Sequence, residues 1–205
     1  MELVILTKSS KFGNYCVAGI DVRTRRWVRL VTDDESVDGA LTDDDCRYAD
    51  NSVMRELDMV NVFDAVPCGG KTHQSENHLF DTRRGLQKIG TFSVPELKLL
   101  LPVHPYPFAL GSPNEKIARR ELDIDHSLEL IAVSDLYLRH NEKRKLKASF
   151  VYQGLQYENF SVTDPALYGR NQYIPRAILA ISLGNHPASN GYYYKFLAKC
   201  YPLDR

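Results

Sequence analysis

Side chains that form hydrogen bonds follow one another at residues 73–77, where the sequence reads His-Gln-Ser-Glu-Asn. Gln74 and Asn77 offer both a donor and an acceptor, so the segment could bind a base edge or a ribose. His73 and Glu76 could also act as acid and base or bind a divalent ion. The alternative is a polar network between two domains that touches no ligand. No second carboxylate, serine nucleophile or metal-ligand set pairs with the segment, which favours binding over catalysis.

Cations and aromatic rings gather in the first thirty residues, where strands are predicted over 2–7, 15–22 and 26–31. In this antiparallel meander the strand ends carry the candidate phosphate contacts Lys8, Lys11, Arg26 and Arg29, and Trp27 is a candidate for stacking on a base. Alternation puts Trp27 on the same face as Arg29 and opposite Val28 and Leu30. Trp27 therefore lies outside if Val28 and Leu30 are in the core; otherwise it is a core anchor.

A second basic group lies further along the chain, between predicted strands over 128–138 and 146–152. Lys143 and Arg144 occupy this turn, which could contact a nucleic acid or only keep the protein in solution. In the predicted last strand, 192–201, Tyr193 and Lys195 share a face that we expect to point outward, where both are candidate nucleic-acid contacts and Tyr193 could stack on a base.

Composition limits the classes of protein that fit. The 205 residues carry no formal net charge and are 43% apolar, which is typical of a protein with a sizeable core and, at most, a local anion-binding surface. Residues 32–64 contain eleven acidic side chains, interpreted as a solvated loop or as a flap over the basic face. Four cysteines lack zinc-ligand spacing, and no apolar run is long enough to span a membrane. We expect no metal, no cofactor and a cytoplasmic location.

The order of elements predicts two domains. Residues 1–101 are predicted to form a barrel with an acidic insert, 102–125 a proline-rich linker and 126–205 a second barrel. The second half has five predicted strands with the longest connection between the third and fourth, the layout of an oligonucleotide-binding (OB) barrel. Ser93 and Glu96 predict a capping box for a helix over 94–101. Asp164, between Thr163 and Pro165, is expected to cap its own backbone.

Several short motifs resemble the bacterial dual OB domain-containing family. They are Leu6-Thr7-Lys8-Ser9, Tyr15 to Asp21, Arg26 to Val31, Leu57 to Val60, His73 to Asn77, Thr163-Asp164-Pro165, Ser182-Leu183-Gly184 and Tyr194 to Ala198. Their order along the chain matches the family over most of its length. The resemblance implies two tandem OB-like barrels in a mobile-element or phage-defence setting, with nucleic-acid binding as the usual inference for activity.

The sequence therefore predicts an all-β protein of two tandem OB-like barrels with a few short helices. Its leading predicted function is non-catalytic binding of nucleic acid, with single strands favoured over duplex. The first alternative is a module that binds a partner protein. The second is an enzyme or small-ligand sensor with a pocket around His73, Glu76 and Asn77.

Overall fold

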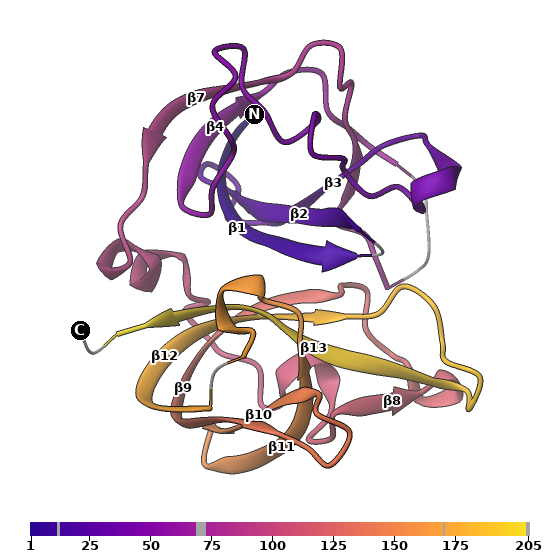
Figure 1. Ribbon diagram of the computed structural model, residues 1–205, viewed down its shortest axis with the longest axis vertical. Coiled ribbons are helices and arrows are strands. Elements are labelled where there is room, and N and C mark those ends of the chain that lie inside the picture. Colours follow the sequence, from indigo (N-terminus) through magenta and orange to yellow (C-terminus); the bar gives the residue numbers. More distant parts are fainter. Residues whose placement is uncertain (12, 69–72, 170, 204–205) are drawn as a thin grey trace. The chain divides into compact units, whose positions relative to one another are not determined.

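Residue contacts divide the chain into two compact units (Figure 1). The computed structural model describes residues 1–11, 13–68, 73–169 and 171–203. The first unit comprises Met1–Gly70 and Ser75–Glu96, and the second comprises Lys71–Gln74 and Leu97–Arg205. Strands dominate both units, and every helix within the described ranges is a short 3-10 helix. The predicted all-β class is confirmed.

The first unit is a curled sheet with the strand order β5-β6-β3-β2-β1-β4-β7. Towards one edge of the sheet β6 pairs in parallel with β3, and at the other edge β7 pairs antiparallel with β4. The sequence predicts a weak strand over 79–81, and β6 overlaps it only at Leu79. The strands are β1 (Glu2–Lys11), β2 (Asn14–Asp21), β3 (Trp27–Val31), β4 (Asp58–Val62), β5 (Val66–Pro67), β6 (Asn77–Leu79) and β7 (Leu86–Thr91).

The acidic insert supplies part of the core of the first unit. Leu41, Cys46 and Met54 are each 1% exposed or less and pack with the strands, and the single helix of the insert is η1 (Glu35–Val37). The Tyr48 hydroxyl donates to a carboxylate oxygen of the buried Asp58 at 2.8 Å. The interpretation of the insert as only a solvated loop is therefore wrong, because its apolar residues fill space that the strands leave open.

The second unit contains a closed five-stranded barrel. The strand order is β11-β10-β9-β12-β13, and a parallel pairing of β11 with β13 closes it. This order, with a parallel closure between the third and fifth strands, is that of an OB barrel. The strands are β9 (Leu128–His140), β10 (Leu146–Tyr152), β11 (Leu155–Val162), β12 (Gln172–Leu183) and β13 (Tyr192–Pro202). Only β12 departs markedly from expectation: the sequence predicts a strand over 177–183, and β12 begins five residues before Ala177.

Residues 102–125, expected to be a loosely packed linker, are built into the second unit. Ala109 and Leu110 have no exposed surface and belong to its core. The strand β8 (Lys116–Ala118) extends the sheet beside β13. Two short helices, η3 (Ala109–Gly111) and η4 (Arg119–Glu121), flank β8.

Two predicted caps are present. The Ser93 backbone N–H donates to the Glu96 carboxylate at 2.7 Å, but the helix that follows, η2 (Pro95–Leu100), is a 3-10 helix and shorter than expected. Pro95 lies at its first position, where a missing N–H costs nothing. Asp164 accepts the N–H of Ala166 at 3.0 Å and caps η5 (Pro165–Leu167), as predicted.

Candidate nucleic-acid interface

Two tyrosines lie side by side on the outer face of the second unit. Tyr137 of β9 and Tyr173 of β12 are register partners, with ring centroids 4.7 Å apart and planes inclined by 35°. Their side chains remain 38% and 48% exposed. Exposed aromatic faces of this kind bind nucleic-acid bases by stacking, at about 1–3 kcal/mol per base.

Cations adjoin the tyrosine pair. The guanidinium carbon of Arg139 lies 5.1 Å from the ring centre of Tyr137, within cation–π range. Lys147 of β10 is the register partner of Arg139, and its Nζ donates to the Asn159 carbonyl at 3.1 Å and the Ser161 hydroxyl at 2.9 Å. Burial lowers the pKa of Lys147. The outer rows of β9, β10 and β12 thus combine aromatic and basic groups.

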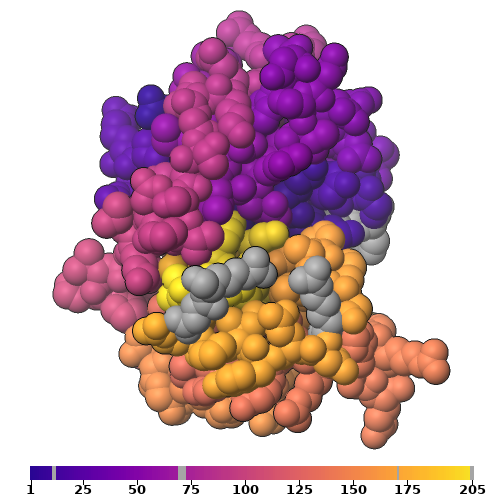
Figure 2. All heavy atoms as spheres, turned by 60° about the vertical axis from the view of Figure 1, so that its left-hand side comes forward, coloured from indigo at the N-terminus to yellow at the C-terminus, as the bar shows by residue number. Residues whose placement is uncertain are grey.

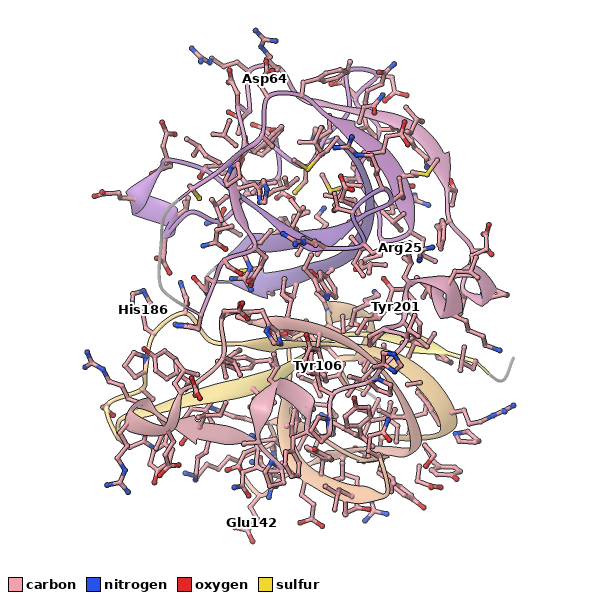
Figure 3. The ribbon with its side chains drawn as sticks, turned by 180° about the vertical axis from the view of Figure 1, so that it is seen from behind. Arg25, Asp64, Tyr106, Glu142, His186 and Tyr201 are labelled. Carbon is pink, nitrogen blue, oxygen red and sulfur yellow. The ribbon has the colours of Figure 1, made fainter. Side chains whose placement is uncertain are left out.

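The turn between β9 and β10 adds further positive charge. Lys143, Arg144 and Lys145 are all exposed, and the Asn141 side-chain oxygen accepts the N–H groups of Lys143 at 3.1 Å and Lys145 at 2.9 Å. Side chains of this turn, coral in Figure 2, project at the lower right of that view. Glu142 is at the tip of the turn and points away from the barrel (Figure 3). The predicted exposed position of Lys143 and Arg144 is confirmed, and their binding role stays a prediction.

An irregularity in β9 turns Tyr137 and Arg139 outward. Ile131 and Val133 point into the core, but so do Leu136 and Leu138, so the inward phase shifts by one residue between the pairs. The register against β10 shifts at the same place, between Ser149 and Val151. A β-bulge has this effect because side-chain direction alternates with period two. The local pattern Leu-Tyr-Leu-Arg over 136–139 carries this signal in the sequence, and our prediction of the site missed it.

Tyr193 and Lys195, expected to form an outward platform, are in fact buried, 8% and 1% exposed. The Lys195 amino group donates to the carbonyl oxygens of Ala109 and Ser112, both at 2.6 Å. The error has a physical cause. The pairing of β12 with β13 shifts register at Ala198, so the inward phase of residues 193–197 is opposite to that of Cys200, from which it was extrapolated.

Arg29 is held in an ion pair in the first unit. Its guanidinium lies 3.3 Å from the Glu76 carboxylate and 3.4 Å from the Asn77 side-chain oxygen, because parallel pairing of β3 with β6 puts Arg29 opposite Asn77. The Arg29 and Glu76 side chains are 11% and 3% exposed. The prediction of Arg29 as an open phosphate contact therefore needs correction. Glu76 and Asn77, in the polar segment 73–77, contact Arg29 and so have a structural role.

The alternation predicted for β3 is confirmed. Val28 and Leu30 are buried in the core, whereas Trp27 and Arg29 lie on the other face, half-buried. The core-anchor alternative for Trp27 is thus excluded. Stacking of Trp27 on a base stays a prediction.

The other cations predicted in the first unit differ in their surroundings. The Lys8 amino group lies 4.2 Å from the ring centre of Tyr15. A hydrogen bond with Asp43 of the acidic insert raises the pKa of Tyr15, so Lys8 is close to negative charge. Arg26 is exposed at the end of a turn. The side chain of Lys11 lies outside the described part of the chain.

The polar segment 73–77 is divided between the two units. His73 and Gln74 are buried and belong to the second unit, where the His73 ring meets the Tyr193 ring edge-on at 4.8 Å. Glu76 and Asn77 belong to the first unit and contact Arg29 there. Each half therefore has packing or ionic contacts inside its own unit. The role of the segment in ligand binding stays a prediction.

Residues 1–200 match the family model described as the dual OB-containing domain. The chain belongs to this family. The match covers both units, and it confirms the resemblance inferred from the short motifs. Comparisons with curated proteins and with solved structures gave no match.

The described ranges were also compared with the requirements of a membrane-spanning helix and of a metal site. None of their helices has the length and apolar character needed to cross a membrane. Nor do they contain a group of three or more His, Cys, Asp or Glu residues placed to hold a metal ion.

Proposed function

We propose that this protein binds single-stranded nucleic acid on the outer face of β9, β10 and β12. Tyr137 and Tyr173 stack on bases, and Arg139, Lys147 and the β9–β10 turn contact phosphates. The observation that carries the proposal is the exposed tyrosine pair with Arg139 against it. OB barrels commonly bind oligonucleotides on the face of their second and third strands and the adjoining loops. Here β10 and the β9–β10 turn belong to that region, whereas the tyrosine pair lies beside it on the first and fourth strands.

Charge distribution also supports the proposal. Between residues 137 and 147 the chain has five Lys and Arg residues against the single carboxylate of Glu142, although the whole protein has no net charge. A local excess of cations attracts a phosphate backbone without a basic coat over the whole surface. Stacking favours single strands, because bases in a duplex are already stacked and paired.

Fluorescence polarisation with labelled single-stranded DNA, single-stranded RNA and duplex, at two salt concentrations, tests the proposal. Tyr137→Ala/Tyr173→Ala and Lys143→Glu/Arg144→Glu should each weaken binding at least tenfold. Tyr168→Ala is the aromatic control, since Tyr168 is 50% exposed elsewhere on the second unit, and Arg119→Glu/Arg120→Glu is the charge control. Arg26→Glu measures any contribution of the first unit. No binding to any probe by folded protein would refute the proposal.

A second candidate function, docking of a partner protein, is favoured by a different observation. Residues 102–108, Pro-Val-His-Pro-Tyr-Pro-Phe, are all exposed, and Val103 is 90% exposed. Exposed proline-rich segments with apolar side chains fit aromatic grooves on partner proteins. Affinity purification from the source cells, comparing wild type with Val103→Asp/Phe108→Asp, tests this function. A set of associated proteins that is identical in both would argue against it.

A further inference from the structure

A carboxylate lies directly beside the tyrosine pair. Asp135 is the residue in β9 at which the register against β10 shifts, and its φ of +51° is in the left-handed region that Asp tolerates better than most residues. On β12 the residue opposite is Pro175, which has no N–H to pair with β9. The bulge and the proline together interrupt the regular pairing of β9 with β10 and β12 at Asp135.

The Asp135 carboxylate is tied to the stacking surface. Its Oδ1 accepts a hydrogen bond of 2.8 Å from the Tyr173 hydroxyl, and this bond raises the pKa of Tyr173. Asp135 itself is half-buried and keeps access to solvent. A negative charge on a face that meets phosphates disfavours contacts with the nucleic-acid backbone. Its position at the edge of the Tyr173 ring instead suits contact with a stacked base.

Among the bases, guanine matches a carboxylate best. Its Watson–Crick edge has two adjacent donors, N1–H and the N2 amino group, which can meet two carboxylate oxygens as a guanidinium does. Each oxygen of an ionised carboxylate has two lone pairs, so Oδ1 can accept from Tyr173 and from a base together. Adenine and cytosine offer one donor beside an acceptor. Uracil and thymine place their single donor between two carbonyl oxygens that repel the carboxylate.

We propose that Asp135 gives this interface a preference for guanine at the nucleotide stacked on Tyr173. The proposal rests on the proposed function, because it requires a base on the tyrosine pair. It assigns the recognition of base identity to a residue that makes no phosphate contact. Asp135 lies within β9, so the preference does not depend on the basic turn between β9 and β10.

The experiment compares labelled single strands of one length with the repeats TG, TA, TC and TT, at fixed salt. Wild type should bind the TG strand about tenfold more tightly than TT. Asp135→Asn keeps a residue that tolerates the left-handed conformation and should reduce the difference to within about twofold. Tyr173→Phe removes the hydroxyl but keeps the ring and the carboxylate, and should retain the preference for guanine.

The outcomes separate the two proposals. No binding of any strand would overturn the proposed function and this inference with it. Equal binding of all four strands by wild type, or an unchanged guanine preference in Asp135→Asn, would overturn the inference alone. Uniformly tighter binding by Asp135→Asn, without a preference in wild type, would show simple repulsion of phosphate and would also overturn it. Circular-dichroism melting curves confirm that each variant is folded.

Discussion

Lys195 and Ala109 lie 86 positions apart, yet the amino group of one donates to the carbonyl oxygen of the other at 2.6 Å. The same group donates to the Ser112 carbonyl at 2.6 Å and to the Ser112 hydroxyl at 3.1 Å. Three oxygen acceptors match the three donors of a lysine ammonium group. This explains how a lysine can be 1% exposed, and it shows what fixes residues 109–112 to the barrel.

Lys195→Met should therefore lower the free energy of unfolding by about 2–4 kcal/mol, because buried carbonyl groups lose their donor. Urea denaturation followed by circular dichroism measures the change. Lys143→Met, in the exposed turn, is the matched control and should change stability by less than about 0.5 kcal/mol. Equal midpoints for the two variants would show that the three hydrogen bonds do not stabilise the fold.

Two side chains, His126 and Lys195, should change the stability of the fold with pH in opposite directions. A hydrogen bond with Glu129, helped by Asp125, raises the pKa of His126 from 6.5 to about 9. Its stabilising effect is thus complete below pH 6.5 and is lost as the pH rises to about 9. Burial lowers the pKa of Lys195 from 10.5 to about 7, so its effect has the opposite sign: stability is lost as the pH falls from 10.5 to about 7.

Between pH 7 and 9 the two effects should largely cancel in wild type. Stability of His126→Gln should then rise with pH over this range, whereas that of Lys195→Met should fall. Denaturation midpoints at several pH values from 6.5 to 9 provide the measurement. Parallel pH profiles for the two variants would contradict the assignment of opposite signs.

Arg29→Met should destabilise the first unit by about 3–5 kcal/mol, because it leaves the carboxylate of Glu76 buried without its cation. Adding Glu76→Gln should restore part of the loss, since the buried group that paired with Arg29 then carries no charge. Arg26→Met is the control at an exposed neighbouring cation. Thermal unfolding of all three variants gives the comparison, and a double variant no more stable than Arg29→Met would refute the ion-pair explanation.

Lys143→Gln/Arg144→Gln should reduce the salt dependence of binding to single strands. Each lost phosphate contact lowers the slope of log affinity against log salt concentration by about 0.7, which gives about 1.4 for the pair. Polarisation titrations over a range of salt concentrations measure the slope. Arg119→Gln/Arg120→Gln should leave it unchanged, and an unchanged slope in the first pair would place the phosphates elsewhere.

Local patterns predicted much of this fold. Alternation in β10 put Leu146, Ala148 and Phe150 inside, and all three are buried. The Asp164 cap required only its neighbours in sequence. The order of five strands identified the second barrel, and the family match agrees with it.

The interface was harder to predict because it depends on irregularities. Bulges at Asp135 and Ala198 reverse which residues face outward, and an alternation extrapolated from one end of a strand passes over such an extra residue. Tyr173 was missed because β12 was expected to begin at Ala177. The partner of Arg29 could not be found from spacing, since Glu76 reaches it through a parallel pairing 47 positions later in the chain.

The closure of the second barrel by β11 and β13 has a consequence for synthesis. Every other strand of this barrel leaves the ribosome before β13, and at about 5–20 residues per second the interval between Leu183, the end of β12, and Pro202, the end of β13, is about 1–4 seconds. During that interval the edges of β11 and β12 that pair with β13 are unpaired, and β13 does not yet cover their apolar faces. Chaperones that bind exposed strands therefore have a defined period in which to act on this protein, and the arrival of one strand ends it.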